Sequence, residues 1–209
     1  MADKRPLRIA LTGSIAMGKS TVSQMIRDEG VPVFDADATV HELYTKGGRA
    51  VPMIANHFPD AIVDDAVERT RLSALVLNDH DAIRLLENIV HPLVHDEQRR
   101  FLEAAERTGA ALVVFDIPLL YEGDRANEFD AVIVVSAPAA VQRERALARP
   151  GMSREKFEAI LARQVPDQEK RRRADFVVST GVSLEDTRVA VKKVMSELRR
   201  RAEQQAGNS

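Results

Sequence analysis

The chain has 209 residues, of which 44% are hydrophobic and 30% charged, with a formal net charge of −2. This balance is typical of a folded globular domain and argues against a chain-wide nucleic-acid surface, so nucleic acid is not expected as a partner. The absence of cysteine excludes disulfides and thiolate metal sites, and it fits a cytoplasmic protein. No apolar run approaches the ~20 residues that span a membrane, and residues 1–13 do not read as a secretory signal.

Five short apolar runs predict strands buried on both faces, because none alternates apolar and polar residues. They are Leu7–Leu11, Val31–Phe34, Leu112–Phe115, Val132–Val135 and Phe176–Val178. Helical patterns lie between them, one over 18–29 and another after Ser183, a predicted N-cap with Asp186 three residues on. Alternating strands and helices predict an α/β fold with a parallel sheet of about five strands.

Two connections are longer than a crossover needs. Over seventy residues (35–111) separate the second and third strands, without a convincing strand and rich in helix formers, which predicts a helical insertion. A shorter insertion surrounds "ARPGMSREKFEAILARQVPDQEKRRR" and predicts a helical lid, with Gly151 after Pro150 marking a break. The predicted domains are a core (1–36, 110–140 and 166–205), an insertion (37–109), a lid (141–165) and a frayed tail (206–209).

The segment "GSIAMGKS" fits the pattern G-x-x-x-x-G-K-[ST] between a predicted strand and a predicted helix. In such a loop, backbone N–H groups surround a polyphosphate, and glycine lacks the Cβ that would block close approach. Lys19 would bind the β- and γ-phosphates of ATP, and Ser20 would ligate Mg²⁺. The predicted nucleotide-binding residues are Gly13, Ser14, Ile15, Ala16, Met17, Gly18, Lys19, Ser20 and Thr21.

Acidic residues follow two of the predicted strands. Asp116 ends the third strand, where it would hold the metal with Ser20, unless it is only a turn residue before Pro118. Asp35 and Asp37 follow the second strand. One of them would take the proton of an acceptor hydroxyl as it attacks the γ-phosphoryl group, although either could simply cap the next helix. Spacing does not say which.

The segment from Arg143 to Arg173 is basic, which indicates either a compact anionic ligand or a solvated helix with ion pairs. Arg145 and Arg149 are four residues apart and are predicted on one helix face, from which they would close over ATP. Asn78 faintly resembles a guanine-recognition residue, but its neighbours predict a helix end. The five histidines do not predict a metal site.

Several segments together resemble the dephospho-CoA kinase family, from Leu7 to about Gly181. They are "LTGSIAMGKSTV", "VPVFDADATVHEL", "NIVHPLV", "DIPLLYE", the "RALAR…SRE…ILARQ" stretch and "RRRADFVVSTG". The resemblance implies a P-loop NTPase core related to nucleoside monophosphate kinases, a helical acceptor domain and a lid. It also implies the reaction of MgATP with dephospho-CoA to give ADP and coenzyme A, by phosphorylation of the ribose 3′-hydroxyl in the last step of coenzyme A biosynthesis.

The resemblance also implies roles for individual residues. Asp37, the second Asp of "DAD", matches the family's candidate base, and Arg145 and Arg149 match lid positions. Gln164 matches a recurrent glutamine. The acceptor side would be lined by Asp35, His91, Pro92, Pro118, Leu119, Leu120 and Glu122. Together with Lys19, we expect Asp37 and Arg145 to act in catalysis, in a monomer or weak homo-oligomer.

Two segments depart from the family pattern. Family P-loops commonly read "GGIGSGKS", whereas this chain has Ser14, Ala16 and Met17 in place of Gly, Gly and Ser. Alanine at positive φ costs about 1 kcal/mol or more, so we predict a negative φ at Ala16. Thr180 stands where the family often has Asn, which leaves an adenine contact from that turn open.

Two other functions remain open from the sequence. A nucleoside or nucleoside monophosphate kinase would share the core and differ in its inserted helices. A P-loop ATPase switch would hydrolyse nucleotide without an acceptor.

Overall fold

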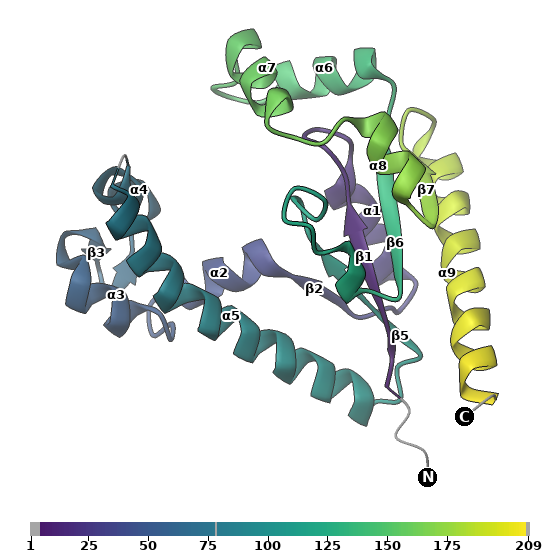
Figure 1. The fold of residues 1–209 in the computed structure, drawn as a ribbon, viewed down its shortest axis with the longest axis horizontal. Coiled ribbons are helices and arrows are strands. Elements are labelled where there is room, and N and C mark those ends of the chain that lie inside the picture. Colours follow the sequence, from purple (N-terminus) through teal and green to yellow (C-terminus); the bar gives the residue numbers. More distant parts are fainter. Residues whose placement is uncertain (1–4, 78, 208–209) are drawn as a thin grey trace. The chain divides into compact units, whose positions relative to one another are not determined.

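The computed structural model describes residues 5–77 and 79–207 (Figure 1). Asn78, predicted at a helix end, lies outside the described residues, as do residues 208 and 209 of the predicted tail. The chain divides into two compact units. One comprises residues 5–34 and 104–207, and the other comprises Asp35–Glu103. The boundaries of the second unit lie a few residues from those predicted for the insertion (37–109). The predicted lid falls within the first unit.

Five strands of the first unit form one sheet in the order β2-β5-β1-β6-β7. They are β1 (Leu7–Thr12), β2 (Val33–Asp35), β5 (Leu112–Asp116), β6 (Ala131–Ser136) and β7 (Phe176–Ser179). β1 pairs in parallel with β5 and β6, and β6 pairs in parallel with β7. All five predicted strands are therefore confirmed, within two residues of their predicted ends.

Side chains alternate between the two faces of this sheet, and both faces are covered. Ile9 and Leu11 of β1 belong to a core with residues of α1 (Lys19–Asp28) and α9 (Leu184–Gly207). Ala10, between them, packs on the opposite face with Leu120 and Tyr121. Strands buried in this way have no polar face, which explains why the sequence shows continuous apolar runs.

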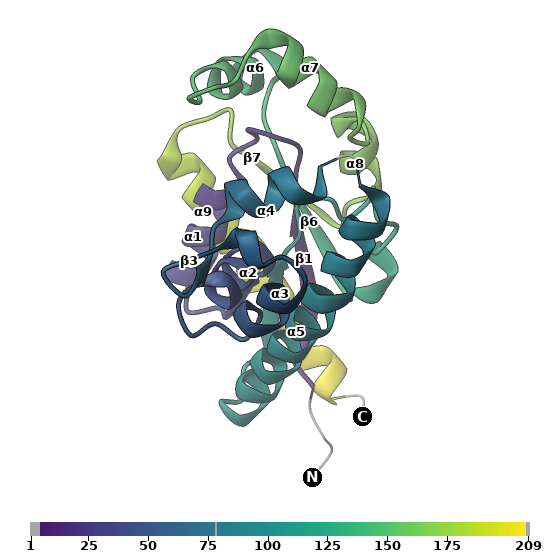
Figure 2. The ribbon, with the colours of Figure 1, turned by 90° about the vertical axis from the view of Figure 1, so that its left-hand side faces the viewer.

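Three further helices complete the first unit: α6 (Ala139–Leu147), α7 (Arg154–Ala162) and α8 (Asp167–Arg173), with a 3₁₀ turn η2 (Ala126–Glu128). Figures 1 and 2 show α6 and α7 beyond the upper end of β1, over the loop that connects β1 to α1. Ser183 caps α9 as predicted, because its Oγ accepts the N–H of Asp186 at 3.0 Å. Helix α9 continues to Gly207, so residues 206 and 207 of the predicted frayed tail have helical backbone.

The second unit has its own apolar core. Its elements are α2 (Ala36–Tyr44), α3 (Val51–His57), the 3₁₀ turn η1 (Pro59–Ala61), β3 (Ile62–Val63), β4 (Ala66–Val67), α4 (Arg69–Val76) and most of α5 (His80–Arg107). Leu43, Ile54 and Leu72 are among the buried residues that these helices contribute to that core.

The prediction that this insertion contains no strand is wrong. β3 and β4 have two residues each and pair as an antiparallel hairpin. Its turn residues, Asp64 and Asp65, have φ of 50° and 64°, which is the conformation of a tight type I′ hairpin turn. Strands this short leave no periodic pattern, so the sequence gives no signal for them.

Helix α5 runs for 28 residues through Pro92. Among the described residues, no helix is both long enough and apolar enough to cross a membrane.

Candidate nucleotide-binding site

The loop between β1 and α1 carries the predicted phosphate-binding motif. Gly18 precedes the first helical residue with φ of 85°, so the helix begins at Lys19, one residue later than predicted. The first N–H groups of a helix have no intrahelical partner, and together with the helix dipole they favour an anion at this end. The motif therefore lies where the sequence placed it, at the carboxyl end of a central parallel strand.

The two glycines of the motif are required by packing within the protein as well as by a ligand. A Cβ on Gly13 would lie 2.7 Å from the carbonyl oxygen of Val135 in β6, closer than real Cβ contacts allow. A Cβ on Gly18 would lie 3.1 Å from Oγ1 of Thr180, at a φ that disfavours other residues. From the sequence, glycine was expected here only because it admits phosphate, and these contacts add a packing reason.

The predicted negative φ at Ala16 is wrong. Ser14 to Met17 form a turn in which the Met17 N–H donates to the Ser14 carbonyl at 3.2 Å. Ala16 is its third residue and has φ of 61°, as a type II turn requires. Alanine tolerates this conformation at a cost of about 1–2 kcal/mol, and its methyl group is buried beside Ala146 and Phe157.

Two glutamines hold the peptide groups of Ile15. Gln164, after α7, accepts the Ile15 N–H through Oε1 at 3.1 Å. Gln142, in the first turn of α6, donates from Nε2 to the Ile15 carbonyl at 2.8 Å. The fixed roles of the backbone groups determine which amide atom of each glutamine faces the loop. The sequence singled out Gln164 only through the family resemblance, and nothing in the pattern identified Gln142.

Thr180 holds the loop at Met17. Its hydroxyl donates to the Met17 carbonyl at 2.6 Å and accepts from Nη1 of Arg145 at 3.1 Å. Nη2 of Arg145 donates to the Thr180 carbonyl at 2.7 Å. Thr180 is 6% exposed, so the residue that departs from the family pattern works as a buried support for the loop.

Lys19 and Asp116 contact each other, which the sequence did not indicate. Nζ of Lys19 forms an ion pair with Oδ1 of Asp116, which is 4% exposed at the end of β5. Asp116 is therefore more than a turn residue. Ser20 is exposed in the first turn of α1. Carboxylate and hydroxyl oxygens are the hard ligands that Mg²⁺ takes, so the donor set of Ser20 and Asp116 fits this ion.

The two arginines assigned to the lid do not share a helix face. Helix α6 ends at Leu147, so Arg145 is helical and Arg149 lies beyond the helix. The cause is Pro150, since a residue before proline disfavours the helical conformation. The Arg149 guanidinium is exposed and makes no hydrogen bond or ion pair with residues 5–77 or 79–207.

Asp35 and Asp37 have different surroundings in the second unit. Asp35 is the N-cap of α2, and its Oδ1 accepts the Ala38 N–H at 3.0 Å. Asp37 lies exposed in the first turn of α2, and within the described part of the chain its side chain has no hydrogen bond or ion pair. The capping role open to either residue thus belongs to Asp35, and Asp37 keeps a free carboxylate.

The residues expected on the acceptor side are distributed over both units. His91 and Pro92 are exposed on α5 in the second unit. After β5, Leu119 is 53% exposed, whereas Leu120 is fully buried in the core. The Pro118 carbonyl accepts from the Thr12 hydroxyl at 3.3 Å.

Glu122 belongs to a buried ion pair that the sequence did not indicate. Its Oε1 lies 2.8 Å from Nζ of Lys170, which is fully buried, and accepts the Val165 N–H at 2.9 Å. Burial alone would raise the pKa of Glu122, but Lys170 and the backbone N–H groups outweigh it and hold the pKa below its usual value. Lys170 lies in the basic run "KRRR", where every lysine and arginine looks like a surface residue.

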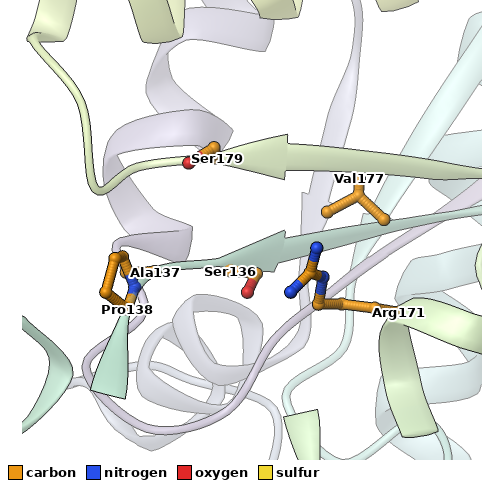
Figure 3. Close-up of a pocket in the computed structure, with 6 residues that line it drawn as sticks. All are labelled: Ser136, Ala137, Pro138, Arg171, Val177 and Ser179. Atoms are coloured by element: carbon orange, nitrogen blue, oxygen red, sulfur yellow. The ribbon is translucent and has the colours of Figure 1, made fainter. Parts of the chain in front are cut away.

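A small cavity of about 190 Å³ lies at the ends of β6 and β7. Figure 3 shows Arg171 reaching toward it from α8, with the side chains of Ser136, Ala137, Pro138, Val177 and Ser179 around it. None of the predicted site residues lines this cavity, and it is smaller than the 300–1,000 Å³ typical of ligand pockets.

The dephospho-CoA kinase family model matches residues 7–186. The dephospho-CoA kinase of Novosphingobium aromaticivorans is 52% identical over 195 residues, which cover 93% of this chain and 96% of that protein. That of Mesorhizobium japonicum is 50% identical over 191 residues, covering 91% and 96%. A crystal structure of a Thermus thermophilus protein matches with a TM-score of 0.76 and 37% identity, covering 93% of this chain and 99% of that one.

Proposed function

The chain belongs to the dephospho-CoA kinase family, and we propose that it transfers the γ-phosphoryl group of ATP to the ribose 3′-hydroxyl of dephospho-CoA. The observation that carries this proposal is the Lys19–Asp116 pair beside the loop of residues 13–18. A phosphate-binding lysine and a strand-end carboxylate placed together are what phosphoryl transfer from a magnesium nucleotide needs.

The nucleotide is assigned to residues 13–21. The helix N-terminus and Lys19 bind the phosphate chain, and Ser20 and Asp116 hold Mg²⁺, which neutralises phosphate charge when bound. When ATP enters, Lys19 exchanges its contact with Asp116 for one with phosphate. Arg149, whose guanidinium has no partner in the described chain, is assigned to the nucleotide charge. Arg145 acts through Thr180, which supports the loop.

Asp37 is assigned as the general base. Its free carboxylate accepts the proton of the 3′-hydroxyl as that oxygen attacks the γ-phosphorus. The new O–P bond forms while the bond to the bridging oxygen of ADP breaks, and ADP leaves with the electron pair. Asp35 positions Asp37 by capping α2. In-line transfer of this kind needs orientation more than covalent help from the protein.

The acceptor is assigned to His91 and Pro92 of the second unit and to Pro118 and Leu119 of the first. Leu120 and Glu122 support this side from the core, because one is fully buried and the other is held by Lys170. A cytoplasmic location and a monomeric or weakly oligomeric state are further proposals. Light scattering after size-exclusion chromatography tests the latter.

The decisive experiment measures ADP release from MgATP with dephospho-CoA, AMP, CMP, adenosine or no acceptor, and weighs the products by mass spectrometry. We expect rapid turnover only with dephospho-CoA and a product heavier by one phosphoryl group. Turnover with another acceptor would instead support a nucleoside or nucleoside monophosphate kinase. ADP release without any acceptor would support an ATPase switch.

A further inference from the structure

The orientation of one peptide group in the phosphate-binding loop depends on a residue far away in the sequence. A turn with positive φ at its third residue differs from the commoner type I turn chiefly by a flip of its central peptide. Here that peptide joins Ile15 to Ala16. Its carbonyl is held by Nε2 of Gln142 at 2.8 Å, and the holding residue is itself only 6% exposed.

The same contact sets the direction of a backbone donor. In a trans peptide, C=O and N–H point in opposite directions, so an Ile15 carbonyl turned to Gln142 sends the Ala16 N–H away from α6. Among the residues that the structure describes, this N–H has no hydrogen-bond partner, although Ala16 is only 6% exposed. An N–H without a partner in a residue that is almost fully buried is rare in proteins and indicates a ligand atom.

The neighbouring N–H groups are already committed to protein acceptors. Ile15 donates to Gln164, and Met17 donates to Ser14. Among Ile15, Ala16 and Met17, Ala16 is thus the residue whose N–H remains for phosphate, yet alanine is the wrong residue to keep φ positive without help.

We infer that Gln142 is a positioning residue, which holds the Ile15–Ala16 peptide in its flipped orientation so that the Ala16 N–H binds nucleotide phosphate. A glycine at position 16 would hold this conformation by itself, whereas the alanine of this chain requires the hydrogen bond from α6. The inference rests on the proposed function only in assigning a nucleotide to the loop, and it is independent of the acceptor.

The test is MgATP binding by calorimetry without an acceptor, on four chains: wild type, Gln142→Met, Ala16→Gly and the double variant. Without the hydrogen bond the flipped peptide becomes the minority state, so we expect Gln142→Met to weaken binding about tenfold. In the double variant glycine removes the cost of positive φ, and binding should return to within about twofold of Ala16→Gly. Should Gln142→Met not fold, Gln142→Glu retains size and polarity while losing the donor.

Gln164→Met is the matched control, because Gln164 holds the same residue through the preceding peptide. Any loss that it causes should not be rescued by Ala16→Gly. A ligand-free crystal structure of Gln142→Met should show a negative φ at Ala16. Equal weakening in Gln142→Met and the double variant, or unchanged binding in both, would overturn the inference. Failure to phosphorylate dephospho-CoA, with these binding differences intact, would overturn only the proposed acceptor.

Discussion

Nζ of Lys170 lies 2.8 Å from Oε1 of Glu122, and this pair joins α8 to the segment after β5 inside the first unit. Lys170 is fully buried, so Glu122 provides the counter-charge that the protein requires there. Removing one partner of such a pair leaves an uncompensated charge, which costs more than the pair itself contributes.

Glu122→Gln should therefore lower the free energy of unfolding at pH 7 by about 3 kcal/mol. The pKa of Glu122 is lowered in the folded protein, so its contribution is present above the unfolded value of 4.5 and is lost as pH falls below it. The difference between wild type and variant should shrink below pH 4.5. Urea unfolding at pH 7 and pH 4 measures this, with Glu144→Gln on the exposed side of α6 as control. A difference that is independent of pH would contradict the ion-pair account.

Lys19→Ala should lower kcat by at least about 100-fold, because the lysine acts on the phosphate chain. It should also lower stability, since Asp116 is 4% exposed and loses its cation. The double variant with Asp116→Asn separates the two effects, because it removes the uncompensated charge. Denaturation should show recovered stability and kinetics should not show recovered turnover. Recovered turnover would mean that Lys19 only balances Asp116.

Asp37→Asn should lower kcat by about 10²–10⁴-fold while leaving MgATP affinity nearly unchanged, because it removes the proton acceptor. Asp35→Asn is the matched control, since asparagine caps a helix as well as aspartate does, and both stability and kcat should change little. Steady-state kinetics with calorimetric MgATP binding distinguish the two variants. The reverse ranking of kcat would assign the base to Asp35.

Thr180→Val should weaken both folding and nucleotide binding. The isosteric change removes the hydroxyl that bonds the Met17 carbonyl and Arg145, and an unsatisfied buried carbonyl costs about 1–3 kcal/mol. We expect a higher KM for MgATP with kcat less affected. Thr180→Ser keeps the hydroxyl and should retain both properties. If the serine variant loses as much as the valine variant, the Thr180 methyl group matters rather than its hydrogen bonds.

The sequence predicts best what is decided locally. The five strands, the loop of residues 13–18 and the strand-end Asp116 were all predicted, because buried parallel strands and a glycine-lysine loop leave continuous patterns. The cap assignments of Asp35 and Asp37 stayed open, because both residues lie at the start of the same helix and only the backbone geometry separates them.

Features set by distant contacts could not be predicted. The φ of Ala16 depends on Gln142, and the burial of Lys170 depends on Glu122. Neither partner lies near the residue that it controls in the sequence. The end of α6 before Arg149 could have been predicted, because Pro150 is visible in the sequence. A proline disfavours the helical conformation of the residue that precedes it.

The close approach of Gly13 to Val135 changes what a mutation in the loop can report. Any side chain there would collide with the β6 backbone, so a variant at position 13 would damage the sheet before it affected a nucleotide. The start of the loop is thus packed against a neighbouring strand, so the position of the Gly13 backbone is fixed without a bound phosphate. Lost activity in a Gly13 variant would measure sheet assembly, and position 16 is where phosphate binding can be examined separately.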